Sequence, residues 1–174
     1  MGRLVRVDPR IQQLRQRIVL AVVRRQPGCN AADVHAALLE LAALGQWPKL
    51  PAPGAQNTPY KGQVLSLLRG LVEAGQVVEY RQEGWALHWM TAEQHKAQAE
   101  AMLPTGDERE RLLRRAAEFQ GRTGMALAFG VTDDFECVVR VETERGCMDF
   151  PVADDERWDE AIQDALDELQ VMAA

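Results

Sequence analysis

The stretch VLSLLRGLVEAGQVVEYRQEGWALHW, residues 64–89, contains two kinds of hydrophobic periodicity. Its apolar residues first recur at helical spacing, which predicts a helix that ends at Gly75. The following residues favour two strands, at 77–81 and 85–90. The intervening sequence QEG, residues 82–84, is typical of a three-residue hairpin turn. The stretch therefore predicts a helix that is followed directly by a tight hairpin.

Two further helices are expected before this unit. Apolar residues recur at helical spacing through residues 9–26, which predicts the first of them. Asn30 is a favourable N-cap for the second helix, and Gly45 is a natural stop. The three prolines in residues 46–57 exclude a regular helix there. We expect this segment to be a loop, with Thr58 capping the third helix.

The rest of the chain has a different pattern. Residues 91–102 and 105–120 both begin with the sequence of a capping box, which predicts two helices. Three later segments favour strands: 125–131, 135–143 and 148–152. From Trp158 to Leu169, apolar residues then follow one face of a final amphipathic helix. We expect an α+β protein with a winged-helix-like N-terminal unit of residues 1–90, a helical connector and dimerisation segment of residues 91–123, and an acidic βββα interaction domain of residues 124–174.

Charge is distributed unevenly along the 174 residues. The formal net charge is −6, but residues 1–96 contain 12 Lys and Arg against 7 Asp and Glu, while residues 97–174 contain 8 against 19. A basic half and an acidic half indicate either two roles or one role with an electrostatic counterweight. The alternative is that two solvated surfaces simply differ in charge.

The order of helix, helix, loop, helix and hairpin resembles the winged helix-turn-helix proteins of bacteria and phages. The resemblance covers roughly residues 9–90, and its most specific part is LLRGLVEAGQVVEY, residues 67–80. In that family the third helix enters the major groove and the hairpin forms the wing. One departure is the long loop of residues 45–57, where the family has a tight turn. The resemblance implies a dimeric, sequence-specific regulator of transcription that binds double-stranded DNA.

Candidate DNA contacts lie on the polar face of the third predicted helix and near the hairpin tip. Amide, guanidinium, ammonium and hydroxyl groups are the side-chain groups that bind base edges in the major groove. Arg81 is placed to reach phosphate or the minor groove from the hairpin. The candidate DNA-binding residues are Tyr60, Lys61, Gln63, Ser66, Arg69 and Arg81.

The sequence contains few signals for metal binding, phosphate binding or catalysis. The three cysteines and three histidines follow no zinc-binding spacing, and no glycine-rich phosphate loop occurs. The carboxylates around residues 133–149 could hold magnesium in a nuclease, but a solvated acidic surface is the simpler interpretation. We expect no enzymatic activity, cofactor or metal, no membrane span, and a location in the cytoplasm. The alternative function is an interaction or inhibitor protein whose two halves dock on a protein partner without binding DNA.

Overall fold

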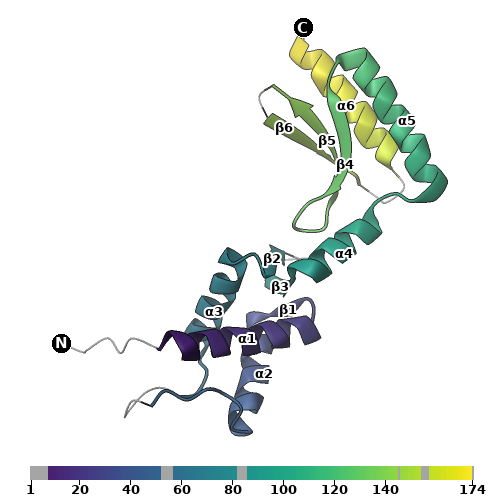
Figure 1. The fold of residues 1–174 in the computed structure, drawn as a ribbon. Helices are drawn as coiled ribbons and strands as arrows, with labels where there is room; N and C mark the ends of the chain where they lie inside the picture. The colour runs from purple at the N-terminus through teal and green to yellow at the C-terminus, as the bar shows by residue number, and fades with distance from the viewer. Residues whose placement is uncertain (1–7, 52–56, 82–85, 145, 154–156, 174) are drawn as a thin grey trace. The chain divides into compact units, whose positions relative to one another are not determined.

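The computed structural model describes five stretches of the chain: residues 8–51, 57–81, 86–144, 146–153 and 157–173, of which residues 171–173 are described by their backbone alone. These stretches form an α+β protein with six helices and two small antiparallel sheets (Figure 1), as expected. The chain divides into two compact units, Met1–His95 and Lys96–Ala174. Each helix in the described stretches is too short or too polar to cross a lipid bilayer.

The N-terminal unit contains three helices and a three-stranded sheet. The helices are α1 (Pro9–Arg25), α2 (Ala31–Ala43) and α3 (Lys61–Glu73), and the strands are β1 (Cys29–Asn30), β2 (Val77–Arg81) and β3 (Leu87–Thr91). The strand order is β1-β3-β2, and both pairings are antiparallel. The two-residue strand β1 was not predicted, because so short a strand has no periodicity of its own.

Local signals in the sequence account for the starts of α1 and α2. The side chain of Asp8 accepts a hydrogen bond from the backbone N–H of Arg10, and Pro9 occupies the first turn of α1. Asn30 and Asp33 form a reciprocal capping box at α2, which confirms the predicted N-cap. The predicted start of α3 was wrong, because the helix begins at Lys61 instead of directly after Thr58.

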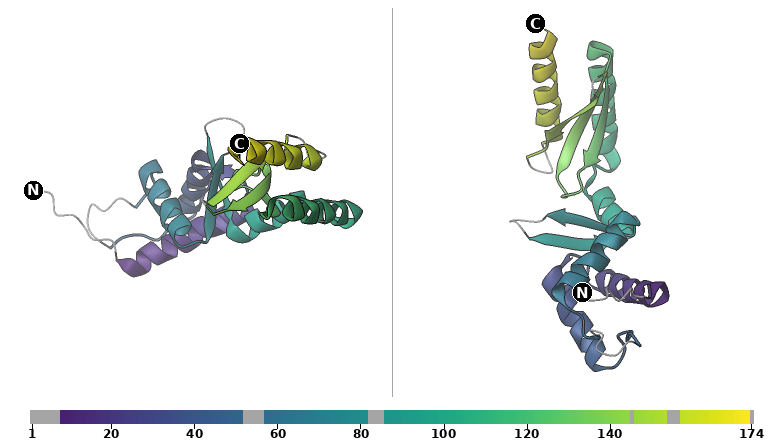
Figure 2. Two further views of the ribbon diagram at one scale, coloured as in Figure 1. Left: turned by 90° about the horizontal axis from the view of Figure 1, so that it is seen from above. Right: turned by 90° about the vertical axis from the view of Figure 1, so that its left-hand side faces the viewer.

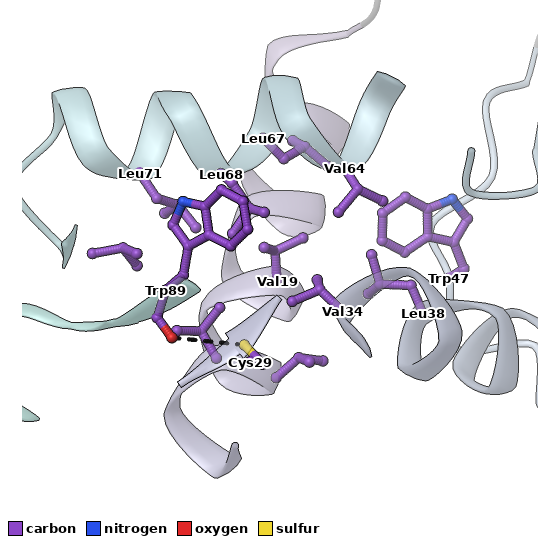
Figure 3. Close-up of a cluster of buried hydrophobic side chains, with 13 residues drawn as sticks. Val19, Cys29, Val34, Leu38, Trp47, Val64, Leu67, Leu68, Leu71 and Trp89 are labelled. Atoms are coloured by element: carbon purple, nitrogen blue, oxygen red, sulfur yellow. Dashed lines mark hydrogen bonds between the residues drawn. The ribbon is translucent and has the colours of Figure 1, made fainter. Parts of the chain in front are cut away.

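The core of the N-terminal unit joins all three helices to the sheet. In Figure 3, Trp47 lies beside Val64 at one end of this core, and Trp89 lies beside Leu71 at the other. The thirteen buried members are Val19, Val22, Val23, Cys29, Val34, Leu38, Trp47, Val64, Leu67, Leu68, Leu71, Val77 and Trp89. Burying apolar side chains contributes about 1.5–3 kcal/mol each relative to exposure, so this cluster fixes how α3 packs on α1 and α2.

The predicted hairpin is present as β2 paired with β3. The register pairs Val77 with Thr91 and Arg81 with Leu87. Leu87 and Trp89 both pack toward the core, as their alternation predicted. Trp85 and the predicted turn at residues 82–84 lie outside the described residues.

The C-terminal unit contains a second sheet covered by two helices. Its elements are α5 (Gly106–Thr123), β4 (Ala126–Val131), β5 (Cys137–Thr143), β6 (Gly146–Pro151) and α6 (Trp158–Ala173). The strand order is β4-β5-β6, and both pairings are antiparallel. Figures 1 and 2 show α5 and α6 on the same face of this sheet. The buried members of its core are Leu112, Phe119, Cys137, Val139, Val141, Trp158, Ala161, Ile162, Ala165 and Leu166.

The structure divides the chain at a different point from the boundaries expected from sequence. α4 (Ala92–Met102) contains the division between the two units, and α5 belongs to the C-terminal unit. The reason is the apolar stripe of α5, because Leu112 and Phe119 are buried in the C-terminal core. The segment 91–123 is therefore not a separate helical connector. The capping box expected at Thr105 is also absent, since the side chain of Thr105 makes no capping hydrogen bond.

Candidate nucleic-acid interface

The two faces of α3 differ sharply in chemistry. Val64, Leu67, Leu68 and Leu71 are at most 2% exposed and hold the inner face against the core. The outer face contains three of the residues predicted to contact DNA, Lys61, Ser66 and Arg69. α3 is therefore a rigid helix whose orientation is set by packing, and its polar face is available to a ligand.

Four of the predicted contact residues lie on the surface of the N-terminal unit. Tyr60 is 48% exposed at the start of α3. Lys61, Ser66 and Arg69 are all exposed along the helix. Their positions bring an aromatic ring, an ammonium, a hydroxyl and a guanidinium group onto one helix. The last three are groups that bind phosphates or base edges.

Gln63 differs from the expectation of a fully outward side chain. It is half-buried, and its Oε1 atom is enclosed without a hydrogen-bond partner in the described part of the chain. Gln63 lies on the same helical stripe as Leu67 and Gly70, at the border of the contact with α1. A Cβ atom added at Gly70 would lie 2.9 Å from Nε2 of Gln16 in α1. α1 thus approaches α3 closely at Gly70, along the stripe that begins with Gln63.

The N-terminal end of α3 is electrostatically positive. Tyr60, the N-cap residue, makes no side-chain capping hydrogen bond, and the first turn contains no acidic residue. The first backbone N–H groups of a helix have no partner within the helix, and the helix dipole adds partial positive charge. Together with Lys61, this end of α3 favours an anion such as a phosphate group.

The loop that precedes α3 is held in place by Arg15 of α1. Nε and Nη2 of Arg15 both donate to the carbonyl oxygen of Pro48, at 3.1 and 2.8 Å. The guanidinium carbon also lies 4.9 Å from the centre of the Trp47 ring, within the range of a cation–π contact. Arg15 is fully buried, and desolvation lowers its pKa. The sequence does not indicate this contact, because nothing in a helical pattern marks one arginine as buried.

Two further contacts order the same loop. Oδ1 of Asn57 accepts a hydrogen bond from the backbone N–H of Leu50 at 2.6 Å, which closes part of the loop on itself. A ring nitrogen of His35 in α2 lies 3.1 Å from the carbonyl oxygen of Pro59, just before α3. The two ends of the loop are thus tied to helices, Pro48 to α1 and Pro59 to α2.

Arg81 is exposed and is the last residue of β2. The preceding strand residue, Tyr80, is buried, and burial raises the pKa of its phenol. Tyr80 therefore belongs to the structural part of the hairpin. Arg81, the next residue, is exposed.

Two of the other chemical groups considered from sequence, Cys29 and Asp149, are engaged in the fold. Burial raises the pKa of the Cys29 thiol to about 11, so the thiol is not ionised at neutral pH. Asp149, one of the acids considered for magnesium, receives hydrogen bonds from Nε and Nη2 of Arg140, both at 2.7 Å. Within the described stretches, no group of three or more His, Cys, Asp and Glu side chains is arranged to hold a metal ion.

We compared the chain with protein families, curated proteins and solved structures and found no match. The candidate interface is therefore defined by the geometry and charge of α3, its supporting loop and the hairpin.

Proposed function

We propose that this protein is a homodimeric transcriptional regulator that binds duplex DNA sequence-specifically through a winged helix. In this proposal α3 lies in the major groove, with Lys61, Ser66 and Arg69 toward DNA. The β2–β3 hairpin is the wing, and Arg81 at its exposed end contacts phosphate or the minor groove.

The observation that carries this proposal is the composition of the outer face of α3. Lys61 and Arg69 are exposed on α3, and its one carboxylate, Glu73, is the last residue of the helix. The start of the helix has no acidic residue and no side-chain cap. An ordinary solvated helix typically mixes both signs of charge and carries acids in its first turn, because they stabilise the helix dipole. The absence of such acids here favours a polyanionic ligand.

The element order supports a winged helix over another helical unit. Three helices precede a hairpin, and β1, between α1 and α2, adds a third strand to that hairpin. Fixed ends of the loop before α3 supply the rigidity that a tight turn gives to other helix-turn-helix units. Dimerisation supports specificity, because one such module reads too few base pairs for tight binding.

The test is selection of duplexes from a random pool, followed by affinity measurements over a salt series. We expect Lys61→Ala and Arg69→Ala to weaken specific binding by about 5- to 150-fold each, the effect of about 1–3 kcal/mol. Arg122→Ala is the matched control, because it removes the same charge from an exposed position in the C-terminal unit. A wild-type protein that selects no sequence and binds no duplex at low salt would instead favour docking on a protein partner.

A further inference from the structure

The first helix, α1, carries several positive charges and no negative one. It contains five arginines and no carboxylate, and no Asp or Glu occurs between Asp8 and Asp33. Arg15 is buried in the core. The other four arginines are exposed: Arg10, Arg17, Arg24 and Arg25. Since a solvated helix normally mixes both signs of charge, this excess of exposed cations indicates an anionic ligand.

Three of the exposed arginines form a straight line, which we call the arginine row: Arg10, Arg17 and Arg24. Residues seven apart complete nearly two helical turns, so the three side chains lie on one face of α1. A rise of about 1.5 Å per residue separates neighbours by about 10.5 Å and makes the row about 21 Å long. Gln13, between the first two arginines, is also exposed and adds an amide donor to the row.

The arginine row is not explained by the stability of the fold. The ion pairs found among the described residues include none of its three guanidinium groups. Asp8, the nearest acid in the sequence, caps α1 by accepting the backbone N–H of Arg10. The helix dipole favours a cation at Arg24, in the last turn, but disfavours one at Arg10, in the first turn. The row is therefore available to a ligand.

The length of the arginine row fits the phosphate backbone of a duplex better than a small anion. The major groove of B-DNA is about 12 Å wide, so a row of about 21 Å extends past it to phosphates on both sides. Guanidinium groups bind phosphate oxygens through paired N–H donors. α1 contains no aromatic residue on which the bases of a single strand could stack. These features favour a duplex over a single strand or a free nucleotide.

An anionic membrane is the other polyanionic surface that a basic helix can bind. A helix that lies in a membrane interface inserts its apolar face among the lipids. The apolar face of α1 is already buried in the protein core, through Val19, Val22 and Val23. Among the residues of α1, all of them described, Leu14 is the only exposed large apolar side chain, at 48%. One leucine gives little apolar area for insertion, so nucleic acid is the better match.

We propose that the arginine row is a second DNA-binding surface, which binds the phosphate backbone of a duplex without reading its sequence. The row lies in the same compact unit as α3, and Gln16 of α1 approaches Gly70 of α3. The inference rests on duplex DNA as the ligand of the proposed function and adds a surface to α3 and the hairpin. It assigns part of the nonspecific affinity to α1, because phosphate contacts carry no sequence information.

The test is the affinity of the full-length protein for a duplex of arbitrary sequence, measured over a salt series. The row variant combines three substitutions that keep a similar helix propensity: Arg10→Gln, Arg17→Gln and Arg24→Gln. We expect its affinity at low salt to fall by about tenfold or more. The slope of log affinity against log salt concentration should become shallower by about 2–3, since each lost phosphate contact removes about 0.9. Arg17→Gln alone should change the slope by about 1.

The matched control makes the same change at three exposed arginines of α5: Arg109→Gln, Arg114→Gln and Arg122→Gln. It alters the net charge of the protein as much as the row variant does, but α5 also contains four carboxylates. Its affinity and salt slope should match those of the wild type. A second control replaces each arginine of the row with lysine, which keeps the charge and should retain most of the affinity. Thermal melting checks that every variant is folded.

Three results would overturn the inference. The first is equal weakening by the row variant and the α5 control, because net charge alone then sets the affinity. The second is wild-type affinity and salt slope in the row variant and in Arg17→Gln. The third is a row variant that loses binding to phosphatidylserine vesicles but keeps its binding to the duplex.

Selection of duplexes from a random pool separates this inference from the proposed function. The row variant should bind more weakly and select the same sequence as the wild type. If the wild type selects no sequence, but the row variant alone loses nonspecific affinity, the arginine row is confirmed and sequence-specific regulation is overturned. If the wild type selects a sequence and the row variant binds every duplex as the wild type does, the arginine row is overturned and the proposed function stands.

Discussion

Arg15 in α1 donates two hydrogen bonds to the carbonyl oxygen of Pro48, in the loop before α3. The guanidinium group is fully buried and also stacks on Trp47. It has no ion-pair partner among the described residues, and its Nη1 atom has no hydrogen-bond partner there. A buried cation without a counterion is unfavourable for stability, so this contact positions the loop at some cost to the free energy of unfolding.

The first prediction separates these two effects of Arg15. Arg15→Met keeps much of the side-chain volume and removes the buried charge, so we expect stability to change by less than about 1 kcal/mol. Arg15→Lys keeps the charge but loses the pair of hydrogen bonds to the Pro48 carbonyl oxygen, so it should destabilise the folded protein by about 2 kcal/mol. In both variants the backbone amides of residues 46, 47, 49 and 50 should exchange with solvent faster, as measured by mass spectrometry.

The control for Arg15 is Arg17→Met, which changes an exposed arginine of the same helix. It should leave both stability and loop exchange at wild-type values. Unchanged exchange in the Arg15 variants would mean that Trp47 and Asn57 hold the loop without help from Arg15.

The second prediction concerns Gly28, which approaches Tyr80. Gly28 has φ +77°, and an added Cβ atom would lie 2.9 Å from the Tyr80 hydroxyl oxygen. Gly28→Ala should therefore destabilise by about 2–4 kcal/mol, from left-handed backbone strain plus steric overlap. Gly45→Ala is the matched control, because Gly45 has φ +73° but no atom within 4 Å of an added Cβ. It should lose only the strain, about 1–2 kcal/mol. Chemical denaturation measures the free energy of unfolding of both variants. Equal losses of stability would show that the Tyr80 side chain moves aside without a cost in free energy.

The third prediction is a pH dependence from the Arg140–Asp149 pair. Hydrogen bonds from Arg140 lower the pKa of the Asp149 carboxyl group. The pair therefore stabilises the folded state above the unfolded carboxyl pKa of about 4, and this contribution is lost as pH falls through the lower folded value. Since the pair is partly exposed, the change should be at most about 1 kcal/mol. Melting temperatures of wild type and Asp149→Asn should converge in acid. If the stability difference between wild type and Asp149→Asn, of at most about 1 kcal/mol, were the same at pH 6 and in acid, the prediction would be contradicted.

The fourth prediction tests the acidic half as an electrostatic counterweight. Asp164, Asp167 and Glu168 are exposed on α6. Changing them to Asn, Asn and Gln removes three of the negative charges that contribute to the net −6. Nonspecific DNA binding should become at least roughly twofold tighter at low salt, and the gap should close as salt rises. The control exchanges Asp for Glu and Glu for Asp at the same positions. Equal affinity in both triple variants would show that this charge does not act on DNA.

Secondary structure followed closely from local patterns in the sequence. The limits of α1, the cap at Asn30 and the strand at residues 77–81 agree with the prediction. The pattern that began at Trp158 also identified the buried face of α6. These features depend on residues close together in sequence, such as capping groups and the alternation of apolar side chains. They can therefore be predicted from a single sequence.

Long-range packing decided the rest. The burial of Arg15, the partial cover of Gln63 and the pairing of β1 with β3 all join residues far apart in sequence. Periodicity identified α5 as a helix, but only the sheet beside it showed which core its apolar stripe enters.

The sequence alone determined the helices, most of the strands and the residues of the polar face of α3, because backbone hydrogen bonding and hydrophobic period act locally. Only the tertiary structure decided how the loop before α3 is held, where the chain divides into units and which arginines of α1 are left exposed. Those features depend on which apolar surfaces bury one another, and a linear pattern does not encode the choice among several surfaces of similar hydrophobicity.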